Sequence, residues 1–271
     1  KMLQNDALGK KLGGTAEPPP DQNEDKTPPW QGPKPYKDKI LWTLLVGYTF
    51  IFSTVSALMI LLPLLLTYPD YGLIDTNSPK TTRENIASGT ALVMVPHGIC
   101  NLLSSTIGFL LISARIGDRN TMRIGSTLSL ICFCLYGYAT SEFWHLCLLH
   151  GLAGCGIGLL VPALGPTLQQ YNNAAHSSNL AQASGLPMFG LSAGMVVGPM
   201  LYGAILGEGQ DRSRMNLAWL VAGGCFGVAY ALLELTFAMI ERHPAMKRLK
   251  MTPKQIKVAL ESQAMDQDVF V

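Results

Sequence analysis

The charged residues of this chain are concentrated at its two ends. Of the 38 Lys, Arg, Asp and Glu residues, 13 lie in residues 1–39, 10 lie in residues 241–271, and only 15 lie in the 201 residues between them. An average soluble domain is about 25% charged, so a stretch this poor in charge cannot cover a surface exposed to water. The distribution argues against a soluble enzyme, a disordered chain and a nucleic-acid-binding protein. It predicts a domain embedded in membrane lipid.

The central residues divide into six apolar runs, each close to the roughly 20 residues that a helix needs to cross a bilayer. These runs are residues 40–67, 88–114, 122–140, 145–168, 180–206 and 216–240. None alternates apolar and polar residues with a period of two, which excludes a transmembrane β-barrel. We therefore expect an all-α membrane protein with six transmembrane helices in residues 40–240, an extramembrane tail in residues 1–39 and a second tail in residues 241–271.

Lys and Arg residues near the ends of the spans predict how the helices are oriented in the membrane. With six spans, both tails share one side with the loops that follow the second and fourth spans. Counted from residue 26 onward, that side holds 13 Lys and Arg residues, whereas the opposite loops hold only Lys80, Arg83, Arg212 and Arg214. The excess predicts that both tails lie on the cytosolic, matrix or stromal side.

Both tails have features of segments that bind partners or rest on the membrane surface. The N-terminal tail is rich in proline, which favours an extended polyproline-like chain. Its aromatic residues Trp30 and Tyr36 are the expected anchors, either in pockets of partner subunits or of the protein's own loops, or among lipid headgroups. In the C-terminal tail, the capping box at residues 252–255 predicts a short surface helix that ends near residue 262.

Few side chains in the spans carry reactive chemistry. All six cysteines fall in apolar runs, where Cys behaves as a small hydrophobe; they are Cys100, Cys132, Cys134, Cys147, Cys155 and Cys225. No His or Cys spacing fits a metal site, and the chain has no nucleophile–base pair or nucleotide motif. We therefore expect no enzyme activity and no cofactor, although bound lipids are expected.

Two ionisable residues inside spans are candidates for a functional polar site. His97 follows Pro96, and it either lines a polar cavity or packs through hydrogen bonds. Glu234 is the one acid well inside a span, and an intramembrane carboxylate is a functional-site hypothesis by default. Because Glu234 lies close to Glu241 and Arg242, it also has the option of reaching the membrane surface.

Three segments resemble motifs of the major facilitator superfamily. Gly194-Met-Val-Val-Gly198-Pro199-Met-Leu-Tyr-Gly203 resembles its Gly-Pro antiporter motif, and Ala114-Arg115-Ile-Gly117-Asp118-Arg119 resembles its basic loop motif. The glycine-rich residues 151–162 also match in order. The resemblance covers residues 40–240 and is to one six-helix half of a drug or vesicular amine:proton antiporter, which implies two inverted three-helix repeats. It implies a helix contact at the three motif glycines and a bend at Pro199.

The departures from that family bear on function. Ala114 stands where the loop motif has an Asp, and Val161 and Met188 stand where the amine transporters have membrane-embedded acids. Exchange of a proton for a cation needs such an acid, and here only Glu234 is available. Transporters of this superfamily place their substrate between two six-helix halves, and this chain has the length of one half.

Two functional hypotheses follow. The first is a transporter-derived structural or accessory subunit of a large multisubunit membrane complex, expected in a mitochondrial or plastid inner membrane. Its partners are other membrane-protein subunits and membrane lipids, with no nucleic acid. The alternative is a small-molecule/proton antiporter that works as a dimer or with a second half, and only this alternative requires a small-molecule substrate.

Overall fold

The computed structural model describes residues 34–138, 142–207 and 211–249, and all regular structure in these ranges is helical. The long helices are α2 (Lys39–Leu65), α3 (Pro79–Leu103), α5 (Asp118–Tyr136), α6 (Phe143–Ala175), α7 (Leu180–Leu206) and α8 (Arg212–Arg242). A π-helix, η3 (Ser104–Gly108), joins α3 to α4 (Phe109–Ile116), and α9 (Pro244–Leu249) follows α8. Three short 3-10 helices, η1 (Pro35–Lys37), η2 (Pro69–Tyr71) and η4 (Ser177–Asn179), complete the described chain. The all-α prediction is confirmed for these ranges, whereas Trp30 and the helix expected at 252–262 lie outside them.

Polar caps determine where three of the long helices begin. Asp38, Ser78 and Asp211 each accept a hydrogen bond from a backbone N–H in the first turn, at the starts of α2, α3 and α8. These bonds satisfy amide groups that a helix leaves unpaired at its N-terminus. Because Ser78 and Asp211 precede the apolar runs, α3 and α8 begin earlier than the spans predicted from hydropathy.

Five helical segments are long and apolar enough to cross a membrane. They are Lys39–Leu65, Pro79–Ile116, Phe143–Ala175, Ser177–Leu206 and Arg212–Arg242, and they correspond to five of the six predicted spans. The remaining prediction, residues 122–140, coincides with α5, which is helical but is not one of these five. The reason is its polar first turns, which include Asp118, Arg119 and Arg123 and leave a shorter apolar stretch.

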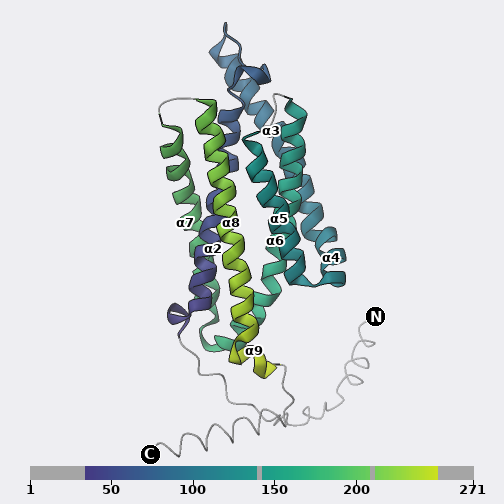
Figure 1. The fold of residues 1–271 in the computed structure, drawn as a ribbon, viewed down its shortest axis with the longest axis vertical. Coiled ribbons are helices and arrows are strands. Elements are labelled where there is room, and N and C mark those ends of the chain that lie inside the picture. The colour runs from purple at the N-terminus through teal and green to yellow at the C-terminus, as the bar shows by residue number, and fades with distance from the viewer. Residues whose placement is uncertain (1–33, 139–141, 208–210, 250–271) are drawn as a thin grey trace, which may run out of the picture.

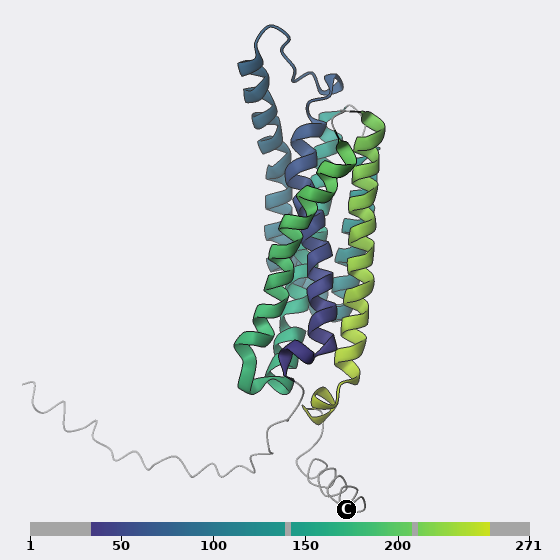
Figure 2. The ribbon, with the colours of Figure 1, turned by 90° about the vertical axis from the view of Figure 1, so that its left-hand side faces the viewer.

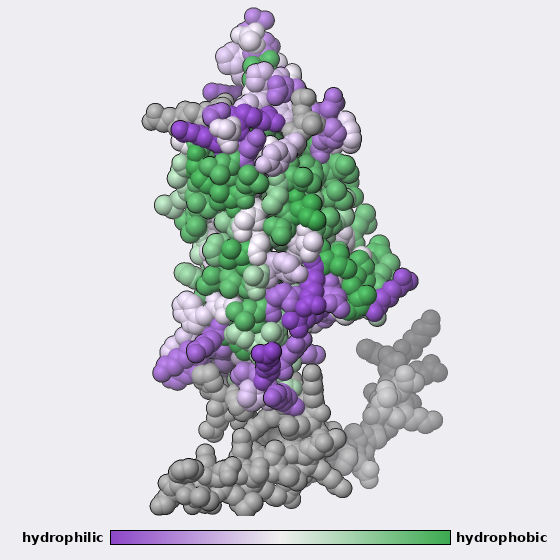
Figure 3. Space-filling model, viewed as in Figure 1, coloured by the Kyte–Doolittle hydropathy of each residue, from purple (hydrophilic) through white to green (hydrophobic). Residues whose placement is uncertain are grey.

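The long helices run up and down one elongated bundle (Figures 1 and 2). α2 packs along α7 and α8, α6 packs along α3 and α5, and α5 also packs along α8. The start of α2 and the end of α8 lie at the same end of the bundle, beside α9 (Figure 1). On the face shown in Figure 3, apolar side chains cover much of the middle of the bundle and polar side chains gather at its two ends, with a polar patch between the apolar areas in the lower half. This distribution suits a membrane-embedded helical bundle.

The glycines of the Gly-Pro motif pack α7 closely against α2. A Cβ atom on Gly194 would lie 2.8 Å from the Ser53 backbone nitrogen, and one on Gly198 would lie 2.8 Å from the Ser53 carbonyl oxygen. The predicted helix contact is therefore present at both positions. It is wrong for Gly203, which is exposed and where a Cβ would meet nothing within 4 Å. Gly203 comes five residues after Gly198 and has turned away from the face on which residues four apart align.

Glycines also bring α6 close to two neighbours. A Cβ on Gly158 would lie 2.6 Å from the Asn101 carbonyl oxygen in α3, and one on Gly125 in α5 would lie 2.5 Å from the Gly156 carbonyl oxygen. Helices in lipid associate through such close backbone packing, since lipid is as apolar as the side chains. Pro199 lies within the uninterrupted α7, and the bend expected there stays a prediction.

We expect Gly198→Ala to destabilise the bundle and Gly203→Ala to leave it intact. The added methyl group at 198 would be too close to the α2 backbone, and such overpacking costs about 1–3 kcal/mol. The methyl group at 203 enters open space. The measurement is the thermal unfolding midpoint of each variant in detergent. Equal midpoints for the two variants would contradict the α2–α7 contact.

Candidate functional site

The loop motif forms a tight turn between α4 and α5. Gly117 has φ of 81°, a left-handed conformation that favours glycine, and it reverses the chain between the two helices. The Ser113 hydroxyl donates a hydrogen bond to the Asp118 carboxylate across this turn. Arg115 lies exposed in the last turn of α4, whereas Arg119 and Arg123 point from α5 toward α8. The turn therefore aims two of the three arginines at one neighbouring helix.

Arg119, Arg123, Glu234 and Glu241 form an ion-pair cluster between α5 and α8. The Glu234 carboxylate accepts hydrogen bonds from Arg119 Nη2 at 2.9 Å and from Arg123 Nε at 2.6 Å. Arg119 Nη1 also donates to Glu241 at 2.8 Å. The side chains of Glu234 and Arg119 are only 23% and 30% exposed, so water screens this pairing less than it would on an open surface.

The contacts of Glu234 favour a structural role over proton exchange. The carboxylate reaches the polar first turns of α5 and is held by two guanidinium groups, which favour its charged form. A proton-exchanging acid needs instead to alternate between charged and neutral forms. The cluster acts as a clamp that ties the start of α5 to the end of α8. The sequence could not show this clamp, because its members are more than 100 residues apart.

His97 belongs to a polar cluster that links α3, α5 and α6. Its Nδ1–H donates to the His150 carbonyl oxygen at 3.2 Å, and the His150 ring approaches Met94 Sδ at 3.1 Å through Nε2. Because a thioether sulfur only accepts, Nε2 of His150 carries the proton, and Nδ1 accepts from the buried Tyr136 hydroxyl. Trp219 stacks on Tyr136 with ring centroids 4.4 Å apart.

These contacts favour the packing alternative for His97. Its described hydrogen bond goes to the neighbouring helix, and the ring of His150 is engaged at both nitrogens. Tyr136 and His150 were missed by the sequence analysis, although a polar aromatic residue and a histidine inside apolar runs are a detectable signal. Among the described residues, no group of three or more His, Cys, Asp and Glu side chains is placed to hold a metal ion.

A second buried polar cluster joins the start of α2 to the ends of α6 and α8. The Asp38 carboxylate lies 2.7 Å from His176 Nε2 and also accepts a hydrogen bond from the Tyr171 hydroxyl. The ring of His243 stands edge-on to Tyr171, with centroids 5.2 Å apart. Burial lowers the pKa of His243 below its usual value of 6.5, and its Nδ1 accepts a hydrogen bond from Ala245 N–H, which requires an unprotonated nitrogen.

The bundle leaves two of its membrane-length segments largely uncovered. In the most apolar 18-residue stretch of Pro79–Ile116, only 6% is buried within the protein. The corresponding share is 22% in Ser177–Leu206 and 61% in Phe143–Ala175. Tyr36 is 53% exposed, so within the described chain it does not bury itself against the protein's own loops. Tyr36 lies in η1 outside the bundle, and its burial by a partner subunit or by lipid headgroups stays a prediction.

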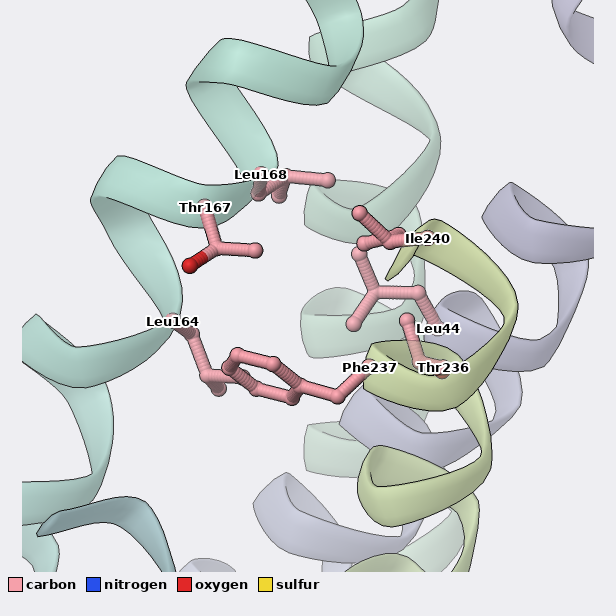
Figure 4. Close-up of a pocket in the computed structure, with 7 residues that line it drawn as sticks. All are labelled: Leu44, Leu164, Thr167, Leu168, Thr236, Phe237 and Ile240. Atoms are coloured by element: carbon pink, nitrogen blue, oxygen red, sulfur yellow. The ribbon is translucent and has the colours of Figure 1, made fainter. Parts of the chain in front are cut away.

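A pocket between α2, α6 and α8 is too small for an organic substrate. Its volume is about 10 Å³, enough for roughly one water molecule. It is lined by Leu44, Leu164, Thr167, Leu168, Thr236, Phe237 and Ile240 (Figure 4). The Thr236 hydroxyl is already bonded to the Leu232 carbonyl oxygen at 2.8 Å, so this space is a packing gap.

No protein-family model matches the chain, and no curated protein matches it significantly.

We expect Glu234→Gln to lower the stability of the protein by about 1–2 kcal/mol, because it removes the charge that two arginines bind. The same substitution in an Arg119→Gln/Arg123→Gln background should cost clearly less, since the pairing is already lost. Thermal unfolding in detergent measures both costs. Glu84→Gln is the matched control, because within the described chain Glu84 pairs with Lys80 at an exposed position. An equal cost in both backgrounds would show that Glu234 acts independently of α5.

We also expect acidification to destabilise the end of the bundle that contains His243. The folded-state pKa of His243 is lowered, so its contribution is complete above the unfolded pKa of about 6.5 and is lost as the pH falls below that value. His243→Gln removes this contribution, and the variant should show a shallower loss of stability between about pH 7 and pH 5. Unfolding midpoints across this range test the expectation, and parallel curves for parent and variant would contradict it.

Proposed function

We propose that this chain is a six-crossing membrane protein with the fold of one major-facilitator half, in which α5 supplies the remaining crossing. The helix contacts support the proposal. In two repeats, α2 corresponds to α6, α3–α4 corresponds to α7, and α5 corresponds to α8. Under this correspondence the packed pair α2–α7 matches the packed pair α6–α3, and α2–α8 matches α6–α5. The pair α5–α8 matches itself. The corresponding helices also run in opposite directions along the bundle (Figure 1), as two inverted repeats require.

In this proposal both tails lie on the cytosolic, matrix or stromal side. The positive-inside rule supports that orientation. Arg119 contacts Glu241, which directly precedes Arg242, so the arginines of the α4–α5 turn and the end of α8 belong to the same end of the bundle. Lys37 and Lys39 at the start of α2 lie at that end as well.

The proposed function is that of a structural or accessory subunit in a larger membrane complex, with an energy-converting inner membrane as its setting. The observation that supports this proposal most directly is the pairing of Glu234 with two arginines. The five apolar segments contain three acids, Glu84, Glu234 and Glu241. Glu84 pairs with Lys80 near the start of α3, and the other two bind the α5 arginines. No acid in these segments is left to couple proton movement to a substrate.

The uncovered faces of α3–α4 and α7 support the proposal that the chain binds another membrane protein. These segments are apolar enough to lie in lipid, but they share little burial with the rest of the chain. The same observation favours one alternative, an antiporter assembled from two copies or from this chain and a second half. In that arrangement, the substrate would bind between the halves and the open helices would line the contact.

Extraction from the native membrane in a mild detergent, followed by native electrophoresis, separates the two functions. An accessory subunit should migrate with a large assembly of different subunits, and the purified chain in proteoliposomes should exchange no organic cation for protons. A chain that migrates as a dimer and produces cation-dependent proton flux would overturn the subunit proposal. Glu234→Gln serves as the control for any flux, since it removes the only acid well inside a span.

We further expect deletion of residues 1–36 to release the protein from its complex without unfolding the bundle. The deletion removes the Pro-rich tail with Trp30 and Tyr36 and keeps Asp38, the cap of α2. Native electrophoresis measures the release, and circular dichroism of the purified variant reports its helix content. Migration unchanged from the parent would eliminate the tail as the docking element.

A further inference from the structure

An open cleft lies where the first and last membrane-length helices meet at the tail end of the bundle. Its volume is about 500 Å³. Lys37, Asp38, Lys39 and Ile40 line it from η1 and the start of α2, and Met239, Arg242, His243 and Pro244 line it from the end of α8 and the start of α9. The two helices pack together, so the cleft is part of the folded bundle.

The charges that line this cleft are unbalanced. Lys37, Lys39 and Arg242 are exposed, and none of them forms an ion pair with a residue in the described ranges. The one acid, Asp38, is 5% exposed, and its carboxylate is already occupied by Ile40 N–H, Tyr171 and His176. The cleft therefore presents three positive charges to an incoming anion.

The depth of the cleft in the membrane is set by its position in the fold. Lys39 is the first residue of one membrane-length helix and Arg242 is the last residue of another, so both cations lie at the ends of helices that are long enough to cross a membrane. Two exposed aromatic residues lie at the same level: Trp42, which is 48% exposed, donates its indole N–H to the Tyr36 carbonyl oxygen at 2.8 Å. Exposed Trp and Tyr side chains mark the headgroup region of a bilayer.

We propose that this cleft binds the headgroup of an anionic phospholipid. The negatively charged phosphodiester would supply the acidic partner that Lys37, Lys39 and Arg242 do not have within the described ranges. A guanidinium can bind two phosphate oxygens at once. Ile40 and Met239 provide apolar contact where the headgroup joins the acyl chains. Basic pockets between transmembrane helices on the cytosolic or matrix side have this chemistry. The inference depends on the cleft alone and holds whether or not the chain joins a larger complex.

A lipid fits the cleft better than a free phosphate ion for two reasons. The cleft is open and lies at the level of the exposed aromatic pair, where lipid headgroups are concentrated. A soluble anion would gain only the three exposed charges, which salt screens strongly. A lipid adds contacts of its glycerol and acyl groups with the apolar lining.

The test is a lipid titration of the purified full-length chain. Phosphatidylglycerol is added to the protein in neutral detergent, and native mass spectrometry counts the bound lipid to give an apparent Kd. The Lys37→Gln/Lys39→Gln/Arg242→Gln variant should raise this Kd roughly tenfold or more, because it removes the three positive charges that attract the phosphodiester. The matched control is Lys80→Gln/Arg83→Gln/Arg115→Gln, which removes as much charge from outside the cleft and should keep the parent's Kd.

Further arms identify the ligand and guard against misfolding. Phosphatidylcholine should bind the parent and both variants equally, and Lys37→Arg/Lys39→Arg should retain phosphatidylglycerol binding because the charge remains. Inorganic phosphate that displaces the lipid, with the same sensitivity to the cleft variant, would overturn the lipid assignment in favour of a soluble anion. Equal losses in the cleft and control variants would overturn the site and leave only diffuse surface charge.

Discussion

The close approach of helix backbones at glycine is the contact on which the rest of this structure depends. Gly194 and Gly198 bring α7 against α2, Gly158 brings α6 against α3, and Gly125 brings α5 against α6. In lipid there is no gain from hiding apolar side chains from water, so helices are held by the fit of their surfaces. These four positions place α2 and α6 at the centre of the bundle, each between two long neighbours.

Polar side chains near the helix ends contact polar side chains of neighbouring helices. Arg119 and Arg123 at the start of α5 find Glu234 on α8, and Asp38 at the start of α2 finds His176. A charge in hydrocarbon is costly unless it is paired or reaches the surface, so the clusters form where a helix end meets its neighbour. These polar contacts thus follow from the packing, and they fix the ends of helices whose middles the glycines have already brought together.

Properties of a single chain segment, such as a membrane-length apolar run, could be predicted from the sequence. Contacts between two helices could not. Hydropathy located five spans because a bilayer-length apolar run is visible along one chain segment. It placed α5 less well, because Arg119 and Arg123 make its first turns polar and only their pairing with α8 explains them. The spacing of Gly194 and Gly198 predicted a shared face, but the same reasoning failed five residues later at Gly203. Contacts such as Tyr136 with His150 need the rotation of each helix about its axis, which no motif supplies.

The same geometry explains which helices remain open. α2 and α6 each pack along two long neighbours, and 56% and 61% of their most apolar 18-residue stretches are buried. α3–α4 and α7 each pack along one central helix, and only 6% and 22% of the corresponding stretches are buried. Small residues lie exposed on the open helices, among them Gly98, Gly185 and Gly203, where a Cβ would meet nothing within 4 Å. Such positions offer lipid little apolar surface and let another backbone approach closely. The two open helices are also the pair that the proposed repeat exchanges, so the surface left for a partner would share the symmetry of the fold.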